Sequence, residues 1–412
     1  MDLHRSTDDR PVNRSGFRGR GLATLPARIW RTAPWDGCGL LRPDPDMAPL
    51  VAWAVRRFWA RFPALVRPLL KAFSGALWTT RAAWLCLRFA RMQGLGPRDL
   101  VRLIGDSVAS GAGPMDAWVW RRLFGTRHPM PPRLVTGLLT RLGDPAALHL
   151  LTDKLESARA FCAAGLAVPE TLMTVEQGWP GAVDELPDRA ALFLKPRRGH
   201  GGQGAEPAAT DPDERRRQIA GLARSDDVLL QVPLTVHPDL ADLSGGVWPP
   251  TLRLTTVRRP GGAPELHSAL LDVTVPGRNP RNFPGGAVRV PVDLTSGRMG
   301  PGLLLSDPGA PMDELPWNAA PLVGRFVPGY ADAVTMVIRA MSVLPPHPVV
   351  NWDIVPTADG PVLVEGNPCG NWILTMFPAA GGVPRGSLAP VLAPWLAPWL
   401  APWNGRSSQD GL

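Results

Sequence analysis

The sequence has few cysteines, and their spacing excludes the common cysteine-based frameworks. Only four occur in 412 residues, and none falls in a C-x-x-C or His-rich spacing; they are Cys38, Cys86, Cys162 and Cys369. Scattered cysteines argue against a disulfide scaffold or a structural zinc site and suit a reducing compartment. The N-terminal residues are polar and rich in Arg and Asp, which is unlike a signal peptide. We therefore expect a cytoplasmic protein.

Long apolar runs are missing from residues 47–92. The longest uncharged stretch there has nine residues, Ala72 to Thr80, whereas a helix needs about 20 apolar residues to span a bilayer. The pattern predicts helix, broken near Pro63–Pro68 and near Gly75. Two interpretations stay open: a basic amphipathic helix in peripheral contact with a membrane, or a helical hairpin packed on the rest of the protein.

Acidic residues are also missing from this segment, and their absence accounts for the charge of the chain. Residues 47–92 carry eight Lys or Arg and no Asp or Glu, while the whole chain has a formal net charge of +8. The residues after 92 contain 28 basic and 30 acidic side chains. Because the bulk of the chain is nearly neutral, it offers no extended surface for a phosphate backbone, and we expect no nucleic-acid partner.

Lysine is scarce in a chain that is otherwise rich in positive charge. Of 44 basic residues only three are lysines: Lys71, Lys154 and Lys195. Where arginine serves almost everywhere, a lysine indicates a position that needs a compact ammonium rather than a planar guanidinium. Chance is the alternative for so small a number.

The chain is long enough for two or three domains. Residues 1–46 lack periodicity and predict disorder, and residues 47–145 predict a helical region. From 146 to 388 short strand patterns are interspersed with helical ones, which predicts an α+β domain. The expected strands are Ala191–Lys195, Val228–Gln231, Thr251–Val257, Leu266–Val275, Ala287–Val292 and Pro361–Glu365, and the expected helices include Asp153–Ala164, Asp213–Ala223 and Tyr330–Val343.

The last segment, residues 389–412, contains Leu-Ala-Pro-Trp three times in succession, from Leu392 to Trp403. A proline at every fourth position disfavours an ordinary helix. We expect an extended appendage and assign it no function.

A lysine at the end of an expected strand precedes a glycine-dense loop. The stretch runs from Phe193-Leu194-Lys195-Pro196 to Gly199-His200-Gly201-Gly202-Gln203-Gly204. Glycines let backbone N–H groups approach a phosphate, and the ammonium adds a point charge. The loop formally matches G-x-G-x-x-G, but a dinucleotide fold needs a helix directly afterwards, and Ala205-Glu206-Pro207 follows instead. A glycine-rich hairpin without a ligand stays the alternative.

A second cluster has the pattern of a strand, a turn at Asp359-Gly360 and another strand. Alternation along the second strand predicts Leu363, Glu365 and Asn367 on one face. Asp353 on the first strand would lie opposite the Glu365–Asn367 end. Hard oxygen ligands of this kind suit Mg²⁺, which fills its shell with nucleotide phosphates. The alternative is a surface hairpin with ordinary acids, although an unpaired carboxylate after Val362-Leu363-Val364 would be costly.

Taken with the segment around Lys154, these clusters resemble the ATP-grasp superfamily, and most closely its sugar-transfer-associated branch, related to alpha-L-glutamate ligases. The resemblance covers about residues 146–380, with motif order and spacing preserved. The segments that carry it are Leu151–Lys154, Leu194–Gly204, Leu229–Pro233, His237–Leu240, Thr251–Leu254, Asn282–Gly286, Val292–Gly297 and Trp352–Asn367. It implies a fold in which two α/β lobes enclose ATP.

The resemblance also implies roles for individual residues. Lys154 and Lys195 would contact the phosphates of ATP, and Gly199, His200, Gly201, Gly202 and Gly204 would belong to the loop that closes over them. Gln231 and Val232 would lie in the hinge that receives adenine. Asp353, Glu365 and Asn367 would hold Mg²⁺ or Mn²⁺. Arg253, with Lys195, would neutralise the transferred phosphoryl group, unless Arg253 is simply a cross-strand charge pair.

The resemblance also implies roles for three further residues. His200 either touches a phosphate or faces solvent, His237 either approaches the ribose or caps the turn before Pro238, and Asn282 begins a turn that could line the acceptor side. The sequence departs from the family where Gln231 replaces a common Glu and where Pro284 follows Asn282. Recognition of the acceptor could differ accordingly.

Three functions follow from this pattern. The first is an ATP-dependent ligase that activates a small-molecule carboxylate as an acyl phosphate and joins it to an amine or another nucleophile. The resemblance to the sugar-transfer-associated branch would place this reaction in polysaccharide or glycoconjugate synthesis. The second is a kinase of a sugar or another small molecule. The third is a nucleotide-binding scaffold at a membrane glycan-assembly complex. The sequence favours the first and does not name the acceptor.

Overall fold

A computed structural model of the chain describes residues 51–52, 55–56, 59–60, 62–125, 139, 141–178, 191–198, 204–244, 248–278, 286–304, 307–368, 388 and 391–397. The predicted disorder of residues 1–46 and most of the glycine-dense loop, residues 199–203, lie outside these ranges.

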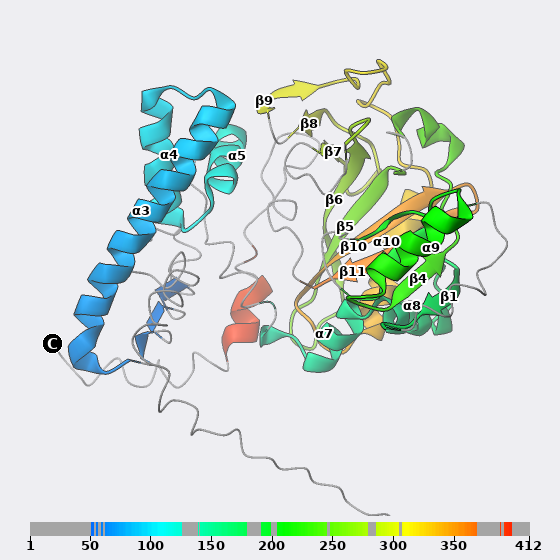
Figure 1. Cartoon of the computed structure of the whole chain (residues 1–412), viewed down its shortest axis with the longest axis horizontal. Helices are drawn as coiled ribbons and strands as arrows, with labels where there is room; N and C mark the ends of the chain where they lie inside the picture. The colour runs from blue at the N-terminus through cyan, green and yellow to red at the C-terminus, as the bar shows by residue number, and fades with distance from the viewer. Residues whose placement is uncertain are drawn as a thin grey trace, which may run out of the picture.

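The N-terminal region is helical, as predicted. A short 3-10 helix, η3 (Ala64–Val66), leads into α3 (Arg67–Gln93), which is followed by α4 (Pro97–Ser110) and α5 (Pro114–Phe124). Figure 1 shows these helices as a bundle beside the strands. The expected break near Gly75 is wrong, because α3 continues through that residue and buries it. A glycine within a helix costs only about 1 kcal/mol, and the apolar contacts of a long helix outweigh that cost.

The smaller sheet has four antiparallel strands in the order β1-β4-β2-β3. Its strands are β1 (Thr171–Val175), β2 (Phe193–Pro196), β3 (Glu206–Pro207) and β4 (Val228–Gln231). Helix α9 (Pro212–Leu222) begins at the cap residue Asp211 and places Ile219 in a core with Leu194, Val228 and Leu230. Leu194, Val228 and Leu230 lie on the same face of the sheet, because side chains of a strand alternate between faces, and the helix covers that face.

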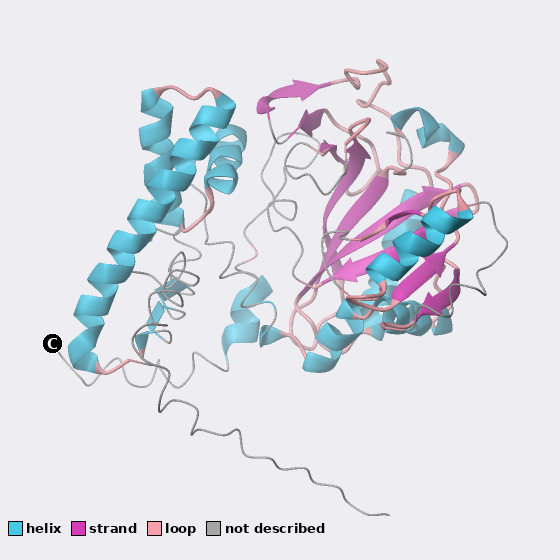
Figure 2. Ribbon diagram, viewed as in Figure 1, coloured by secondary structure: helices cyan, strands magenta, loops and turns pink. Residues whose placement is uncertain are grey.

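The larger sheet has seven strands in the order β11-β10-β5-β6-β7-β8-β9. They are β5 (Thr251–Val257), β6 (Glu265–Thr274), β7 (Ala287–Pro291), β8 (Gly302–Leu304), β9 (Asp307–Met312), β10 (Val349–Thr357) and β11 (Gly360–Asn367). All neighbouring pairs are antiparallel. Figure 2 shows the strands of both sheets together with the helices that flank them. Helices and antiparallel strands of this kind confirm the predicted α+β class.

The main hydrophobic core lies on one face of the larger sheet. Leu254, Leu271 and Trp352 are fully buried there against α10 (Tyr330–Val343). The helices α7 (Pro145–Thr152) and α8 (Lys154–Ala163) add Leu151 and Phe161 to the same core. Because side chains of a strand alternate between faces, the residues between these apolar positions point to the other face, where the predicted site residues lie.

The helical region contacts this other face of the larger sheet. Val119 of α5 is fully buried against Leu270 of β6 and Leu303 of β8, with Met115 and Trp118 packed around them. Leu270 lies opposite Arg253 in the sheet, so both side chains share one face. The helical region is therefore packed beside the predicted site residues rather than attached only through the chain.

Part of the C-terminal repeat is helical, which corrects the expectation of an extended appendage. Residues 391–397 form a helix, and Leu392 and Leu396 are buried. The indole Nε1 of Trp395 donates to the carbonyl oxygen of Arg258 at 2.8 Å. A single proline, Pro394, falls within these residues, so only one helical N–H is lost, and burial of the leucines offsets that loss. The other residues of the repeat lie outside the described ranges.

Candidate active site

The two sheets meet at an ion pair between Lys195 and Glu365. Lys195 lies on β2 of the smaller sheet and Glu365 on β11 of the larger one. The Nζ atom of Lys195 is 2.9 Å from Oε2 of Glu365, and both side chains are largely buried. The structure therefore brings together a residue predicted to contact phosphate and a residue predicted to hold a metal ion, although they are 170 positions apart.

Lys154 belongs to the same charge cluster. It is the first residue of α8, directly after the cap residue Asp153, whose carboxylate accepts from the N–H groups of Leu155 and Glu156. Asp153 is therefore the N-cap of α8. Burial lowers the pKa of Lys154, while Glu365 opposes that change and Lys195 adds to it. The two scarce lysines are thus close enough to influence each other and to share the carboxylate.

Glu365 is held in its ionised form by these lysines. Burial alone would raise the pKa of Glu365, but Lys195 and Lys154 outweigh it and bring the pKa to about 2. A carboxylate with such a low pKa is negative throughout the physiological range, which is the state that a metal ligand needs.

The hairpin of β10 and β11 confirms that Asp353 lies opposite Glu365, and Asn351 lies opposite Asn367. The prediction that Leu363 shares their face is wrong. Asp353 pairs with Glu365 and Ile354 pairs with Leu363, so the register shifts at this point and leaves Val364 as an extra residue, a β-bulge. The bulge turns Leu363 into the core with Ile354 and turns Glu365 toward Lys195. The acid thereby avoids an apolar environment.

Gly366 separates Glu365 and Asn367 for a steric reason. A Cβ atom built on Gly366 would lie 2.6 Å from the ring of Trp352 and 2.7 Å from Leu151. Only a glycine lets α7 and the Trp352 ring pack this closely against β11. Tight packing on the core side of β11 therefore fixes the positions of Glu365 and Asn367, whose side chains project from the other side of the strand.

Arg253 forms a bidentate pair with Asp353 from the neighbouring strand. Its Nε donates to Oδ1 at 2.7 Å and its Nη2 to Oδ2 at 3.0 Å. Although burial opposes the charge, Asp353 and Asp272 raise the pKa of Arg253 above its ordinary value. The pair is the cross-strand charge pair that the sequence left as an alternative, and a role of Arg253 in phosphoryl transfer stays a prediction.

Asn367 completes the predicted ligand set. Its Nδ2 lies 3.4 Å from Oδ2 of Asp353 and 3.3 Å from Oε1 of Glu365. Within the described residues no three His, Cys, Asp or Glu side chains gather as a metal site. A metal here would use two carboxylates and one amide oxygen, a hard-oxygen donor set that fits Mg²⁺ when phosphates fill the remaining positions.

The charged residues continue as a row across one face of the larger sheet. Beyond Arg253, Asp272 of β6 pairs with Arg289 of β7, and the distance from Nε of Arg289 to Oδ1 of Asp272 is 2.9 Å. Sequence reasoning missed this pair, although Asp272 and Arg289 interrupt otherwise apolar strand patterns. Such interruptions are the signal that could have identified it.

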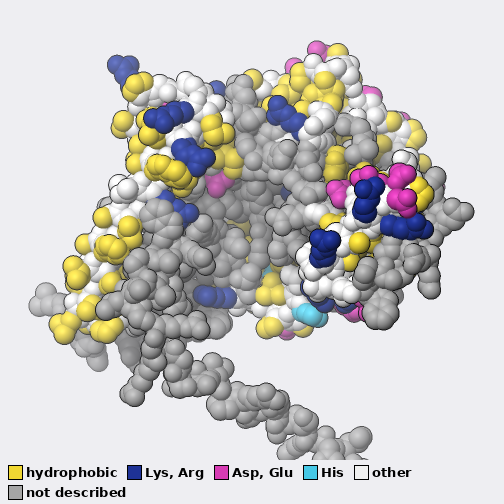
Figure 3. Space-filling view, viewed as in Figure 1, with side chains coloured by type: hydrophobic (Ala, Val, Ile, Leu, Met, Phe, Trp, Pro, Cys, Tyr) yellow, Lys and Arg dark blue, Asp and Glu magenta, His cyan; other side chains and the backbone are white. Residues whose placement is uncertain are grey.

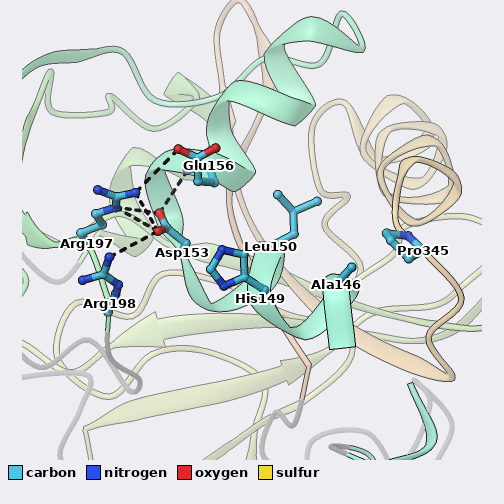
Figure 4. A pocket seen from close by; sticks show the side chains of 8 residues that line it. All are labelled: Ala146, His149, Leu150, Asp153, Glu156, Arg197, Arg198 and Pro345. Carbon is cyan, nitrogen blue, oxygen red and sulfur yellow. Dashed lines mark hydrogen bonds and ion pairs between the residues drawn. The ribbon is translucent and has the colours of Figure 1, made fainter. Parts of the chain in front are cut away.

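Sequence reasoning also missed Arg197, which joins the segments that carry the two lysines. Its guanidinium lies 2.9 Å from both oxygens of Asp153 and 3.1 Å from Oδ2 of Asp227. Its carbonyl oxygen accepts from the N–H of Lys154 at 3.1 Å. Figure 4 shows Arg197 directed at Asp153, with Glu156 beside it. Because Arg197 follows Lys195 by two residues, these contacts tie β2 to the start of α8.

A shallow depression of about 500 Å³ borders this cluster. Figure 4 shows the side chains that line it, which are Ala146, His149, Leu150, Asp153, Glu156, Arg197, Arg198 and Pro345. Lys154 and Lys195 are not among them. The depression therefore lies on the outer side of the Asp153–Arg197 pair rather than at the Lys195–Glu365 contact.

The predicted adenine and ribose contacts are placed as follows. Gln231 is buried at the end of β4 and its amide donates to Oγ1 of Thr171 at 3.1 Å, while the N–H of Val232 donates to the carbonyl oxygen of Glu170 at 3.0 Å. His237 begins the 3-10 helix η5 (Pro238–Leu243), where its Nδ1 accepts from the N–H of Asp239. The capping interpretation of His237 is therefore observed, and its approach to the ribose stays a prediction.

The glycine-dense loop is described only at its end. Gly204 has a positive φ of 71°, and a Cβ atom there would lie 2.7 Å from Pro196, so a side chain would not fit. Gly199, His200, Gly201 and Gly202 lie outside the described residues, as do Asn282 and Pro284. Their predicted roles are not tested by this structure.

Comparisons with known proteins find similarity to part of this chain. Among solved structures, similar ones include the D-alanyl-alanine synthetase A of Vibrio cholerae O1 biovar eltor, at 15% identity and TM-score 0.41, with 63% of this chain and 68% of that chain covered. VanG D-Ala:D-Ser ligase of Enterococcus faecalis is 13% identical with TM-score 0.39, covering 62% and 63%. The ADP complex of purK, an N5-carboxyaminoimidazole ribonucleotide synthetase, is 13% identical with TM-score 0.36, covering 57% and 50%.

This chain thus spans about half the length of the purK chain, and no curated protein matches its sequence. The family model described as "Sugar-transfer associated ATP-grasp" matches residues 134–384. That match covers more than half of the chain and includes every predicted site residue. The chain therefore belongs to the sugar-transfer associated ATP-grasp family.

Proposed function

We propose that this protein is an ATP-dependent ligase that activates a small-molecule carboxylate and joins it to an amine or another nucleophile. The observation that supports this best is the meeting of Lys154 and Lys195 with the Asp353–Glu365–Asn367 edge of the larger sheet. Cations for phosphate and hard oxygen ligands for a metal are the two requirements for holding a nucleoside triphosphate.

In the proposed site, Lys195 and Glu365 would give up their contact with each other and bind the nucleotide and the metal instead. Lys195 would turn from Glu365 toward the β- and γ-phosphates, with Lys154 on the same side, and the loop from Gly199 to Gly204 would cover them. Glu365, released from the lysine, would bind the metal with Asp353 and the amide oxygen of Asn367. A bound Mg²⁺ or Mn²⁺ would neutralise negative charge on the phosphates. Gln231 and Val232 would adjoin adenine, and His237 would approach the ribose.

The proposed reaction has two displacements. A carboxylate oxygen of the substrate attacks the γ-phosphorus, the bond to the β–γ bridging oxygen breaks, and ADP leaves. The nucleophile then attacks the acyl carbon, the acyl–oxygen bond breaks, and the nitrogen loses its proton as phosphate departs. Arg253 lies beside Asp353 and would neutralise the transferred phosphoryl group together with Lys195. The chain's contribution is positioning and charge compensation, and no covalent enzyme intermediate is required.

The experiment that tests this proposal measures ADP release by the full chain with Mg²⁺ and a panel of carboxylates and amines. Hydroxylamine is added in a parallel arm, because it traps an acyl phosphate as a hydroxamate but leaves a phosphate ester unchanged. A hydroxamate that appears with one carboxylate supports the ligase. Stable phosphorylated product without hydroxamate would instead identify a small-molecule or sugar kinase.

A third outcome would identify a scaffold. If the chain binds ATP but no acceptor raises ADP release above that of an Asp353→Ala variant, the ligase proposal fails and a nucleotide-binding scaffold at a glycan-assembly complex is favoured. The family name is the reason to include sugar acids and amino sugars in the panel, and we place the reaction in polysaccharide or glycoconjugate synthesis as part of this proposal.

A further inference from the structure

Helix α3 and the residues next to it carry an unusual concentration of exposed apolar side chains. Of the eleven large hydrophobic residues that are exposed among the described residues, eight lie between Leu65 and Val101. Within α3 itself Leu69 is 74% exposed and Trp84 53% exposed, and Phe73 and Leu87 are also exposed. In Figure 3 hydrophobic side chains follow the length of α3 at the left of the view. Patches of this kind on a folded protein mark a surface that binds something.

These side chains share one side of the helix. Leu69 and Phe73 are four residues apart, Phe73 and Trp84 are eleven apart, and Trp84 and Leu87 are three apart, all of which return to nearly the same direction at 3.6 residues per turn. We call Leu69, Phe73, Trp84 and Leu87 the outer face of α3. Their exposure shows that the other described elements leave this face uncovered.

The opposite side of α3 explains how the helix is held. Trp78, Ala82, Cys86 and Ala90 recur every four residues and are buried. Trp78 and Ala82 pack with Val108 of α4, and Cys86 packs with Leu103 of α4 and Ala117 of α5. Leu69, Phe73, Trp84 and Leu87 are not part of these core clusters.

The charge of α3 selects the kind of partner. Its residues include Arg67, Lys71, Arg81, Arg88 and Arg91 and no Asp or Glu. The guanidinium of Arg88 lies 4.8 Å over the ring of Trp84, so an apolar ring and a cation are presented together. Long basic side chains beside exposed aromatic and aliphatic ones are typical of helices at the boundary between water and lipid. In a dimer formed through this face, two basic surfaces without acidic residues would meet. Repulsion between their positive charges disfavours such a contact.

We propose that the outer face of α3 docks on a membrane surface that contains anionic lipids. Leu69, Phe73, Trp84 and Leu87 enter the boundary between head groups and acyl chains, and Arg88 and Arg91 contact lipid phosphates. The contact is peripheral, because no helix among the described residues is long and apolar enough to cross a bilayer. The sequence left a peripheral membrane contact open for residues 47–92, and the proposal assigns that contact to one side of α3. It does not depend on the proposed ligase activity.

The test is co-sedimentation of the full chain with two kinds of vesicle, phosphatidylcholine alone and phosphatidylcholine with phosphatidylserine. We expect sedimentation only with the anionic vesicles and a decrease as salt is raised. The single variants Arg88→Gln and Arg91→Gln should each weaken binding about fivefold, since each basic residue near an anionic surface contributes to that extent. A triple variant, Leu69→Gln with Phe73→Gln and Trp84→Gln, should lose binding.

The matched control is the double variant Val323→Gln with Phe326→Gln, which changes exposed apolar residues outside the helical bundle and should bind like the unmodified chain. Circular dichroism and thermal unfolding show whether each variant is folded. The proposal is overturned if the unmodified chain stays in solution with anionic vesicles, or if the folded triple variant still sediments. A dimer in light scattering that the triple variant abolishes, without vesicle binding, would overturn it in favour of a second copy.

Discussion

Lys195 on β2 and Glu365 on β11 connect the two sheets through a contact of 2.9 Å between Nζ and Oε2. Each side chain neutralises the other in a largely buried place where an isolated charge would be costly. Under the proposed function, Mg-ATP offers both partners a replacement, phosphate for the lysine and metal for the carboxylate. The ion pair therefore compensates both charges without fixing either of them permanently.

Replacing the predicted metal ligands should remove ATP turnover. We expect Glu365→Gln and Asp353→Asn each to lower kcat/KM by about a hundredfold or more, because each removes one negative oxygen from the proposed metal site. The near-isosteric amides keep most packing but leave Lys195 or Arg253 without its charged partner, so each variant should be folded but less stable than the unmodified chain. ADP release and thermal unfolding are the two measurements. Glu314→Gln, at an exposed acid outside the site, is the control, and full activity in either site variant would falsify the metal assignment.

Replacing Lys195 by arginine should also impair turnover. The side chain is only 7% exposed and points at Glu365, so the larger guanidinium has little room and cannot take the place of a compact ammonium. We expect kcat/KM to fall about tenfold or more, a loss of about 1.4 kcal/mol of transition-state stabilisation. Lys71→Arg is the same change in the exposed part of α3 and should be neutral. Equal activity of both variants would mean that lysine scarcity carries no functional information.

Arg197 should act as a positioning residue for the two lysines. Arg197→Lys keeps the charge but loses the fork that contacts Asp153 and Asp227, so the start of α8 and the end of β2 are no longer held together. We expect KM for ATP to rise about tenfold with a smaller change in kcat, since binding geometry is affected more than chemistry.

The control for Arg197 is Arg198→Lys, because Arg198 is 58% exposed and its guanidinium contacts with Asp153 and Asp226 are 3.9 and 3.6 Å long. A purely structural role would lower the unfolding temperature of Arg197→Lys and leave KM unchanged, which would contradict the positioning role.

His347 should make stability depend on pH. Burial lowers the pKa of His347 from 6.5 to about 4 in the folded state, and Nε2 lies 3.4 Å from the carbonyl oxygen of Pro368. Between these pH values the unfolded chain binds a proton that the folded chain does not, so the free energy of unfolding falls as pH falls from 6.5 toward 4. The loss attributable to this residue is at most about 3 kcal/mol.

The measurement is denaturant unfolding of the unmodified chain and of His347→Gln across this range. Other groups titrate in both proteins, so the difference between the two curves is the readout. The variant should lose less stability on acidification. Parallel curves would show that His347 is protonated alike in the folded and unfolded chains.

Several elements could be predicted from local pattern alone. The strands Val228–Gln231 and Thr251–Val257 and the helix Tyr330–Val343 have the predicted bounds, because each is a periodic apolar run with clear ends. The cap at Asp153 follows from local hydrogen bonding in the same way. The order of Lys154, Lys195, Asp353 and Glu365 along the chain was sufficient to indicate the family. Family membership is thus a property of the linear sequence.

Other features depend on contacts between distant residues. The bulge at Val364 cannot be seen in a strand pattern, yet it separates Leu363 from Glu365. The helix at residues 391–397 forms despite Pro394 because the fold buries Leu392 and Leu396 of this helix. Gly75 does not break α3 for the same reason, since tertiary packing outweighs a weak local preference.

The sequence by itself determined which residues are candidates for the chemistry: lysines where arginine is the rule, glycines after a strand, and acids at the end of an apolar run. Tertiary structure alone decided how they are joined. Only folding places Lys195 on Glu365, Arg253 on Asp353 and Arg197 on Asp153. The attraction between two opposite charges depends on their distance in space, and burial strengthens it by excluding water. The sequence specifies only how far apart two residues lie along the chain.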